Sequence, residues 1–187
     1  MKASIRNLFG GSVLLISPKK INDNRGFFFE NYCKKFFKEI GVYEEFIQEN
    51  ISYSKKTYTF RGIHLQTYPK SQSKLVTVLK GKIIDIVFDL RKSSKTFGKH
   101  IKLKLFSNDS KYLYIPKGFG HAFYTLEPNT IVSYKVSEYY SPKNEKTISV
   151  FDKDLNLKLG ISKNKLILSS KDRNGMLLND FKKFKYK

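Results

Sequence analysis

The chain has 187 residues, 40% of them hydrophobic, so it is long enough and apolar enough to bury one core. Its 36 Lys and Arg against 16 Asp and Glu give a net charge of +20. Only five of these cations are arginine, and many lysines alternate with apolar residues, as in residues 101–105. This alternation is typical of the solvated face of a strand, whereas proteins that read bases and phosphates favour arginine. A nucleic-acid surface is therefore the less favoured interpretation.

The chain has one cysteine, Cys33. A single thiol excludes an internal disulfide and a cysteine metal cluster, and it indicates a reducing cytoplasm. The apolar run from Val13 to Ile16 is too short for a membrane span or a signal core, so no membrane association is expected. We expect a single domain over 1–187, with a core from about 13 to 178 and a basic, aromatic tail over 179–187.

Alternating apolar and polar residues predict a series of short strands. In chain order they cover residues 13–17, 26–30, 48–53, 58–66, 74–79, 83–90, 112–115, 122–126 and 131–136. One helix is expected at about 31–40, ended by Gly41, and a second short helix near 177–181. Many short strands separated by turns predict a mainly β sandwich or barrel with one or two short peripheral helices.

The segment 61–66 carries the clearest sign of a functional site. On a strand, Ile63 and Leu65 face one way, whereas His64 faces the other way together with Gly62 and Gln66. Histidine titrates near neutrality and can accept a proton at working pH. Lys74 begins a later strand, where its cation could stabilise an enolate oxygen. This combination favours proton abstraction next to a carbonyl group.

Other side chains could complete that chemistry. A carboxylate fixes the tautomer of a catalytic histidine, and both Asp172 and Asp85 are candidates. Tyr134 shares a strand face with Val132 and Val136, where it is most often a core residue, but its hydroxyl could deliver a proton.

A metal centre and a cysteine nucleophile are less favoured. The three histidines, His64, His100 and His121, are scattered and show no His-x-His spacing. His100 follows a Gly-Lys turn and is interpreted as an exposed or satisfied side chain. Cys33 lies beside aromatic residues in the expected helix, which suits a buried apolar residue better than an activated thiolate.

An ordered series of motifs resembles the dTDP-4-dehydrorhamnose 3,5-epimerase family, from about Ile16 to Leu178. In order, the motifs are Asp23 to Glu30, Phe46 to Asn50, Arg61 to Gln66, Lys74 to Val76, Asp85 to Arg91, Ile115 to His121, Tyr134, Tyr139 to Pro142, Glu145 and Ser170 to Asp172. Any one motif is weak, but the full series in this order is highly specific.

The resemblance implies a cupin-type jelly roll, or double-stranded β-helix, that forms a homodimer and works without a metal or organic cofactor. It implies conversion of dTDP-4-dehydro-6-deoxy-D-glucose to its C3 and C5 epimer, dTDP-4-dehydro-L-rhamnose. By this likeness, His64 would remove the proton beside the ketone and Asp172 would orient it. Lys74 would steady the enolate, and Tyr134 would return a proton from the opposite face.

The same resemblance implies a set of residues around the nucleotide sugar. Arg25 and Arg61 would hold the diphosphate, because a guanidinium group can donate two hydrogen bonds to it. Tyr140 would stack on thymine. Polar contacts to the nucleotide or sugar would come from Glu30, Gln48, Asn50, Glu145 and Lys171, and the site would be supported by Asp85 and His121.

The chain also departs from the family pattern. Ala122-Phe123 stands where the family usually has Gly-Phe, tryptophan is missing near Phe151-Asp152, and residues 155–167 match poorly. These differences leave room for an epimerase that acts only at C3 of a related 4-keto nucleotide sugar. A non-catalytic basic β-barrel that binds nucleic acid is the alternative from another functional class.

Overall fold

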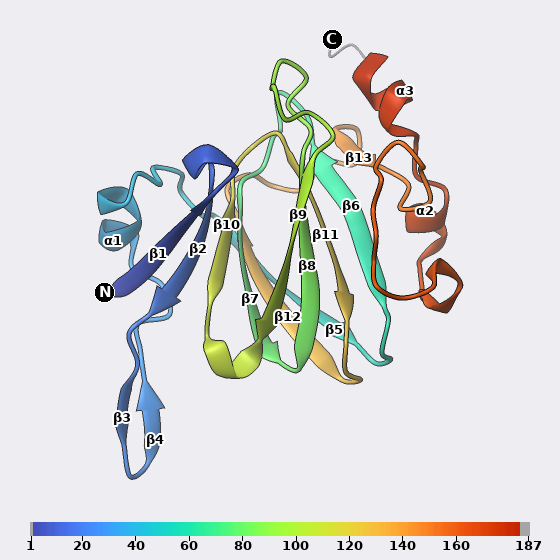
Figure 1. The fold of residues 1–187 in the computed structure, drawn as a ribbon. Helices are drawn as coiled ribbons and strands as arrows, with labels where there is room; N and C mark the ends of the chain where they lie inside the picture. The colour runs from blue at the N-terminus through green and yellow to red at the C-terminus, as the bar shows by residue number, and fades with distance from the viewer. Residues whose placement is uncertain (1, 184–187) are drawn as a thin grey trace.

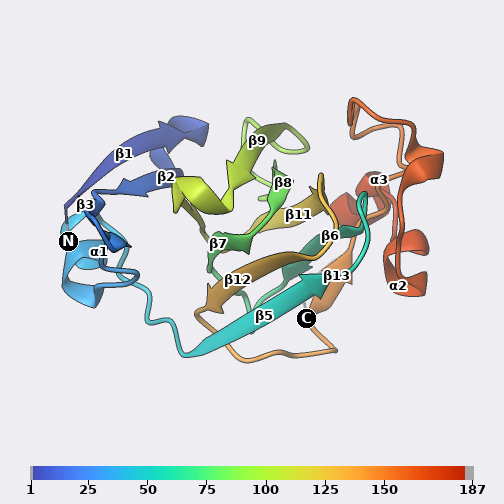
Figure 2. The same cartoon turned by 90° about the horizontal axis from the view of Figure 1, so that it is seen from below.

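The computed structural model describes residues 2–183 and consists mainly of antiparallel strands around a common interior (Figure 1, Figure 2). One sheet has the order β1-β2-β10-β7-β12-β5, a second has the order β13-β6-β11-β8-β9, and β3 and β4 form a separate hairpin. The mainly β prediction is therefore confirmed.

The bounds of the elements are as follows. The strands are β1 (Ala3–Leu8), β2 (Val13–Pro18), β3 (Ile21–Asp23), β4 (Gly26–Phe28), β5 (Gln48–Ser54), β6 (Phe60–Gln66), β7 (Lys74–Lys80), β8 (Lys82–Asp89), β9 (His100–Phe106), β10 (Tyr112–Ile115), β11 (Phe119–Thr125), β12 (Thr130–Val136) and β13 (Glu145–Thr147). The α-helices are α1 (Lys34–Glu39), α2 (Ser170–Arg173) and α3 (Leu178–Lys183), and the 3₁₀ turns are η1 (Phe9–Gly11), η2 (Ser107–Asp109) and η3 (Lys163–Lys165).

Each of the nine predicted strands is present, with ends shifted by a few residues. The helix expected at 31–40 is shorter, because Cys33 is its extended N-terminal cap and Ile40 already has non-helical angles at its end. Gly41 follows with a positive φ of 86°, as its role as a helix stop requires. The helix expected near 177–181 is present as α3. The four-residue helix α2 was not predicted.

The interior between the two large sheets is divided between an apolar part and a polar part. Valines 76, 78, 87 and 132 belong to a buried apolar cluster that both sheets contribute to. Farther along β7 and β12, the inward positions become polar, at Lys74 and Tyr134, and β6 of the other sheet adds His64. The alternation of side chains along each strand therefore directs the predicted reactive groups into the interior.

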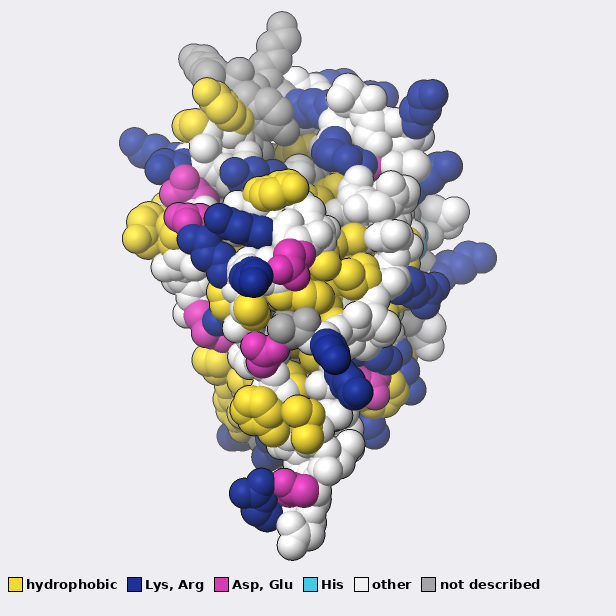
Figure 3. Space-filling view, turned by 90° about the vertical axis from the view of Figure 1, so that its left-hand side faces the viewer, with side chains coloured by type: hydrophobic (Ala, Val, Ile, Leu, Met, Phe, Trp, Pro, Cys, Tyr) yellow, Lys and Arg dark blue, Asp and Glu magenta, His cyan; other side chains and the backbone are white. Residues whose placement is uncertain are grey.

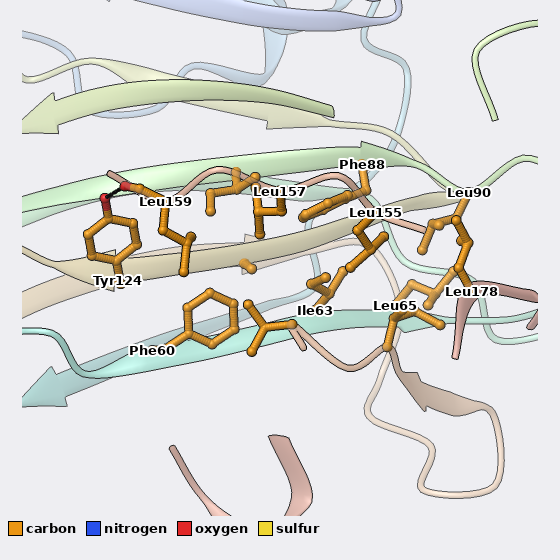
Figure 4. Close-up of a cluster of buried hydrophobic side chains, with 14 of the residues drawn as sticks. Phe60, Ile63, Leu65, Phe88, Leu90, Tyr124, Leu155, Leu157, Leu159 and Leu178 are labelled. Carbon is orange, nitrogen blue, oxygen red and sulfur yellow. Dashed lines mark hydrogen bonds between the residues drawn. The ribbon is translucent and has the colours of Figure 1, made fainter. Parts of the chain in front are cut away.

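A second apolar cluster lies on the outer face of the five-stranded sheet. The C-terminal segment runs across this face and packs Leu155, Leu157 and Leu159 against β6, β8 and β11 (Figure 4). The Tyr124 hydroxyl also donates a hydrogen bond of 2.6 Å to the carbonyl of Leu159. Residues 155–167 match the family motifs poorly. They nevertheless cover the outer face of the five-stranded sheet, whose inner face lines the interior.

The expected tail over 179–187 is partly integrated into the core. Residues 179–183 belong to α3, and Phe181 is fully buried in the outer cluster. The backbone N–H of Leu178 donates a hydrogen bond to the carboxylate of the buried Asp152, at 2.5 Å, which holds the start of α3. Residues 184–187 of the expected tail lie outside the described part of the chain.

The lysine-rich strand β9 shows the predicted alternation. Lys102 and Lys104 are exposed, whereas Leu103 packs against the cluster between the sheets and Leu105 is buried in it. Among residues 2–183, no helix has both the length and the apolar character needed to cross a membrane.

The motif at the end of β8 is a structural network. The carboxylate of Asp89 is fully buried and accepts hydrogen bonds from Arg91 at 2.9 and 2.8 Å, from Ser94 at 2.6 Å and from Thr96 at 2.5 Å. Burial alone would raise the pKa of Asp89, but the hydrogen bonds from Arg91, Ser94 and Thr96 lower it far below its ordinary value.

We expect Asp89→Asn to lower the free energy of unfolding at pH 7 by about 3 kcal/mol, because the change removes the charge from several buried hydrogen bonds that Asp89 accepts. A depressed pKa contributes stability that is present above the unfolded pKa, near 4, and is lost as pH falls through the folded pKa. Urea denaturation should therefore show the difference between the two proteins shrinking below about pH 4. Asp180→Asn, an exposed change, is the control. A difference that stays constant with pH would contradict this account.

Candidate active site

His64 forms a close pair with Asp172. His64 faces the interior from β6, and its Nε2 lies 2.5 Å from Oδ1 of Asp172, which is only 3% exposed on α2. Because Nε2 is bonded to the carboxylate, the pair favours the tautomer that leaves Nδ1 as a proton acceptor. The structure thus brings together the base and one of the two carboxylates that the sequence offered for it.

The second carboxylate candidate, Asp85, pairs with a different histidine. Both oxygens of Asp85 lie within hydrogen-bond distance of Nε2 of His121, at 3.0 and 2.9 Å. Asp85 is fully buried and His121 is 8% exposed. His121 on β11 lies directly opposite His64 in the strand register. Two histidine–carboxylate pairs therefore stand side by side on the five-stranded sheet.

Lys74 faces these pairs from the six-stranded sheet. Its Nζ lies 3.4 Å from the backbone oxygen of His64. Burial lowers the pKa of Lys74 to about 8, although the nearby charges of Glu145 and Asp85 oppose that shift. Lys74 is therefore mostly a cation at pH 7 and loses its charge only slightly above neutrality.

Tyr134 enters the same space from β12. Its strand neighbours are Val76 on β7 and Asn50 on the edge strand β5, so Tyr134 lies on the second strand from this edge of the six-stranded sheet. Burial raises the pKa of Tyr134, and the charge of Arg61 opposes the shift. The phenol thus keeps its proton at neutral pH, as a proton donor must.

Polar side chains on and around β5 line the adjoining wall. Gln48 and Asn50 point to the same side of β5, and the Gln48 amide donates a hydrogen bond of 2.7 Å to Oδ1 of Asn50. Arg61 is held in place by its hydrogen bonds to the Ser54 hydroxyl at 3.3 Å and to the carbonyl of Tyr53 at 2.9 Å. This bonding fixes the direction of the guanidinium group.

Glu145 joins two segments at the edge of the site. It accepts a hydrogen bond of 2.7 Å from the Tyr140 hydroxyl and forms an ion pair of 2.5 Å with Lys171 of α2. Burial would raise the pKa of Glu145, but its bonds from Lys171 and Tyr140 lower it below its ordinary value. Glu145 is therefore an anion that links the 139–142 loop to the helix that carries Asp172.

These groups surround one cavity of about 770 Å³ between the two sheets and α2. That volume lies in the range of sites for cofactors and drug-sized ligands. The predicted residues on its wall are Gln48, Asn50, Arg61, His64, Lys74, His121, Tyr134, Tyr140, Glu145, Lys171 and Asp172. His64 and Tyr134 thus line the cavity from opposite sheets, and the ammonium group of Lys74 lines the same cavity.

Three predicted residues do not line this cavity: Asp85, which is fully buried behind its bond to His121, Arg25 and Glu30. Arg25 lies in the turn between β3 and β4, where its side chain is 86% exposed and paired with Asp23 at 2.6 Å. Glu30 is exposed just after β4. The hairpin that carries Arg25 projects away from the sheets (Figure 1).

The cavity wall also includes residues that the sequence did not single out. Gln72 lies in the segment before β7, where no alternation of side chains identifies it. Ser169 precedes α2, and Ser169-Ser170-Lys171-Asp172 has the serine and acid spacing of a helix start, a signal that could have been used. Among the described residues, no group of three or more His, Cys, Asp or Glu side chains is arranged to hold a metal ion.

Comparisons with known proteins agree with this geometry. Residues 11–180 match the family model described as dTDP-4-dehydrorhamnose 3,5-epimerase. The chain is 39% identical over 169 residues to the dTDP-4-dehydrorhamnose 3,5-epimerase of Shigella flexneri, an alignment that covers 90% of this chain and 92% of the relative.

Solved structures show the same likeness in three dimensions. The dTDP-4-dehydrorhamnose 3,5-epimerase of Bacillus anthracis, with TDP and PPi bound, superimposes with a TM-score of 0.90 at 40% identity, covering 94% of this chain and 99% of that one. The dTDP-6-deoxy-D-glucose-3,5-epimerase of Legionella pneumophila, in complex with dTDP-4-keto-L-rhamnose, gives 0.89 at 36% identity and covers 95% and 94%. Agreement in sequence and fold over nearly the whole chain shows that it belongs to the dTDP-4-dehydrorhamnose 3,5-epimerase family of isomerases, built on a cupin-type jelly roll.

Proposed function

We propose that the protein inverts C3 and C5 of dTDP-4-dehydro-6-deoxy-D-glucose to give dTDP-4-dehydro-L-rhamnose. The observation that supports this function best is the placement of a carboxylate-oriented base, His64, and a protonated phenol, Tyr134, on opposite sheets around one cavity. A base and an acid on opposite sides of a sugar ring are what inversion at carbon requires.

The first step is removal of the proton next to the C4 ketone. His64 accepts the proton on Nδ1, while the electrons of the broken C–H bond move into the carbonyl group and give an enolate. Asp172 stabilises the resulting imidazolium through Nε2. Lys74 places its positive charge near the same site and stabilises the enolate oxygen. This step draws on the acidity that the ketone gives to its neighbouring C–H bonds, so we propose that no cofactor takes part.

The second step returns a proton to the other face of the ring. Tyr134 donates its phenolic proton to the carbanion carbon, and the ketone reforms. If His64 returned the proton instead, the starting sugar would be restored. The raised pKa of Tyr134 keeps the phenol protonated until this step.

The remaining cavity residues suit the nucleotide. Arg61, whose direction is fixed by Ser54 and Tyr53, would hold the diphosphate with paired hydrogen bonds. Tyr140 would stack on thymine, its ring oriented by the bond to Glu145. We assign polar contacts with the nucleotide or sugar to Gln48, Asn50, Glu145 and Lys171, and support of the reacting group to Asp85 and His121.

We further propose that the protein acts as a cytoplasmic homodimer and that each copy completes the site of the other. The β3–β4 hairpin exposes three large apolar side chains, Ile21, Phe27 and Phe28. Figure 3, which views the molecule from the left-hand side of Figure 1, shows hydrophobic side chains at the surface of this face. Exposed apolar side chains on a projecting element suit packing against a second copy. Such packing would carry Arg25 and Glu30 toward the cavity of the partner.

Incubation with dTDP-4-dehydro-6-deoxy-D-glucose in heavy water tests the reaction. NMR should show deuterium at C3 and C5 together with the inverted sugar. His64→Asn should slow exchange by roughly 10²–10⁴-fold because the base is lost. Tyr134→Phe should retain exchange but lose inversion, since the opposite-face donor is gone. Deuterium at C3 alone would instead support the C3-only alternative.

The matched control is His100→Asn, which makes the same change at a histidine on β9 that does not line the cavity. This variant should behave as the unaltered protein does. Near-normal turnover by His64→Asn would overturn the proposed mechanism, and absence of exchange in the unaltered protein would overturn the proposed substrate.

The pKa of Lys74 predicts a limit at high pH. With its pKa lowered to about 8, Lys74 is charged below that pH and neutral above it. We expect kcat to fall as pH rises through about 8, because the enolate loses its cation. Lys74→Arg should be slower but keep its charge, since guanidinium stays protonated, and should not show this decline. Parallel pH–rate profiles measure the difference, and an identical decline in both proteins would assign it to another group.

Mixing two inactive variants tests the shared site. Arg25→Ala and His64→Asn should each be impaired alone. After subunit exchange, half of the dimers would be mixed, and one of their two sites would have both His64 and the partner's Arg25. Activity should therefore recover to roughly a quarter of the normal value. Sedimentation should show a dimer, and mixed dimers without recovery would place Arg25 outside the partner's site.

A further inference from the structure

The carboxylate that orients His64 stands on a very short helix. α2 covers only Ser170–Arg173, too few residues to be stable by its own hydrogen bonds. Yet Asp172 lies 2.5 Å from His64, a residue 108 positions earlier in the chain. Contacts outside the helix must therefore fix the position of Asp172.

The first of these contacts is the N-terminal cap of α2. The hydroxyl of Ser169 accepts a hydrogen bond of 3.1 Å from the backbone N–H of Asp172. An acid at this third helical position commonly turns back to the N–H of the cap residue. Here the Asp172 carboxylate points to His64 instead. Ser169 thus holds the backbone of the residue whose side chain holds the base.

Backbone hydrogen bonds fix the chain before the cap. Phe60 donates to the carbonyl of Ile167 at 2.9 Å, and Ile167 donates to the carbonyl of Tyr58 at 3.0 Å. These bonds join the segment to the start of β6, the strand that carries His64. The segment that leads to Ser169 is therefore hydrogen-bonded directly to the start of the strand that carries His64.

A second set of bonds fixes the chain after the helix. Met176 donates to the carbonyl of Thr147 and accepts from the N–H of Ser149, both at 2.9 Å. Thr147 is itself the strand partner of His64. Between the helix and this bridge, Gly175 approaches so closely that a Cβ there would lie 2.6 Å from the nitrogen of Ser149. A side chain at this position would push the end of α2 outward.

We propose that Ser169 and Gly175 are positioning residues of the catalytic pair, which clamp α2 from its two ends so that Asp172 meets His64. The inference rests on the proposed function for its effect on catalysis, but the geometry it concerns exists in the free protein. Neither residue touches the reacting atoms in this role. Ser169 acts through the backbone of Asp172, and Gly175 acts by permitting close approach to Ile148 and Ser149, in the segment that follows β13.

Proton NMR of the free protein tests the clamp directly. The proton shared by His64 and Asp172 should give a low-field resonance, assigned by its loss in Asp172→Asn. In Ser169→Ala it should move upfield or broaden through exchange with water. Ser169→Asp, which restores a capping oxygen, should bring it back. Ser170→Ala, at the neighbouring exposed position, is the matched control and should leave it unchanged.

Kinetics test the consequence for catalysis. Ser169→Ala should lower kcat by roughly 10- to 100-fold with little change in KM, because misplacing an orienting group affects the chemical step. In an Asp172→Ala background the same change should have no further effect, since it acts only through Asp172. Gly175→Ala should resemble Ser169→Ala, and circular dichroism should show that both variants fold.

The outcomes separate this inference from the proposed function. An unchanged resonance in Ser169→Ala, or an equal loss of kcat with and without Asp172, would overturn the positioning role. If the unaltered protein does not act on the dTDP-sugar, the proposed function fails, and the NMR comparison still decides whether Ser169 holds Asp172 against His64.

Discussion

The hydrogen bond between His64 and Asp172 connects the inside of the fold to its outer cover. His64 belongs to the inner face of the five-stranded sheet, whereas Asp172 belongs to the C-terminal segment that crosses the outer face of that sheet. Packing of Leu155, Leu157 and Leu159 on the outer face therefore has two effects. It buries apolar surface, worth roughly 1.5–3 kcal/mol for each fully buried leucine, and it fixes the path of the chain that leads to α2. The same C-terminal segment therefore stabilises the fold and orients His64.

The polar interior is tolerated because nearly every group in it has a partner. A buried carboxylate or ammonium is costly unless it is paired and hydrogen-bonded. Asp85 has His121, Glu145 has Lys171 and Tyr140, and the surroundings of Lys74 include two of these carboxylates. Lys74 is the least completely compensated of these groups, since burial still lowers its pKa to about 8. A weakly solvated cation interacts more strongly with a developing oxyanion, so in the proposed mechanism the burial that lowers the pKa of Lys74 would also strengthen its interaction with the enolate.

Local sequence patterns predicted which side of a strand a residue faces, but not which side chain of another element it contacts. Period-two alternation correctly grouped His64 with the polar face of its strand and Tyr134 with Val132 and Val136, because the direction of a side chain on a strand depends only on its neighbours in the chain. Alternation could not choose between the two carboxylates, Asp85 and Asp172, that the sequence offered as partners of a histidine. Only the strand order, which brings β11 beside both β6 and β8, assigns Asp85 to His121. The helix that carries Asp172 is too short to show a helical period, and the distance of Arg25 from the cavity depends on the path of a hairpin that no alternation describes.

The large positive charge also has a consistent place in this arrangement. Exposed lysines such as Lys102 and Lys104 lie on the outside of the molecule, whereas the cavity wall has three cations, Arg61, Lys74 and Lys171, against the two carboxylates of Asp172 and Glu145. The charge therefore does not mark a single polyanion site. It instead produces a general positive field, which raises the local concentration of an anionic ligand and speeds its encounter with the protein. Within the cavity, the guanidinium group of Arg61 has a direction fixed by its hydrogen bonds, so in the proposed function it would discriminate between ligands. In the proposed function, a diffuse field would attract any diphosphate, whereas paired hydrogen bonds from Arg61 would select the orientation that brings the ketone of the nucleotide sugar between His64 and Tyr134.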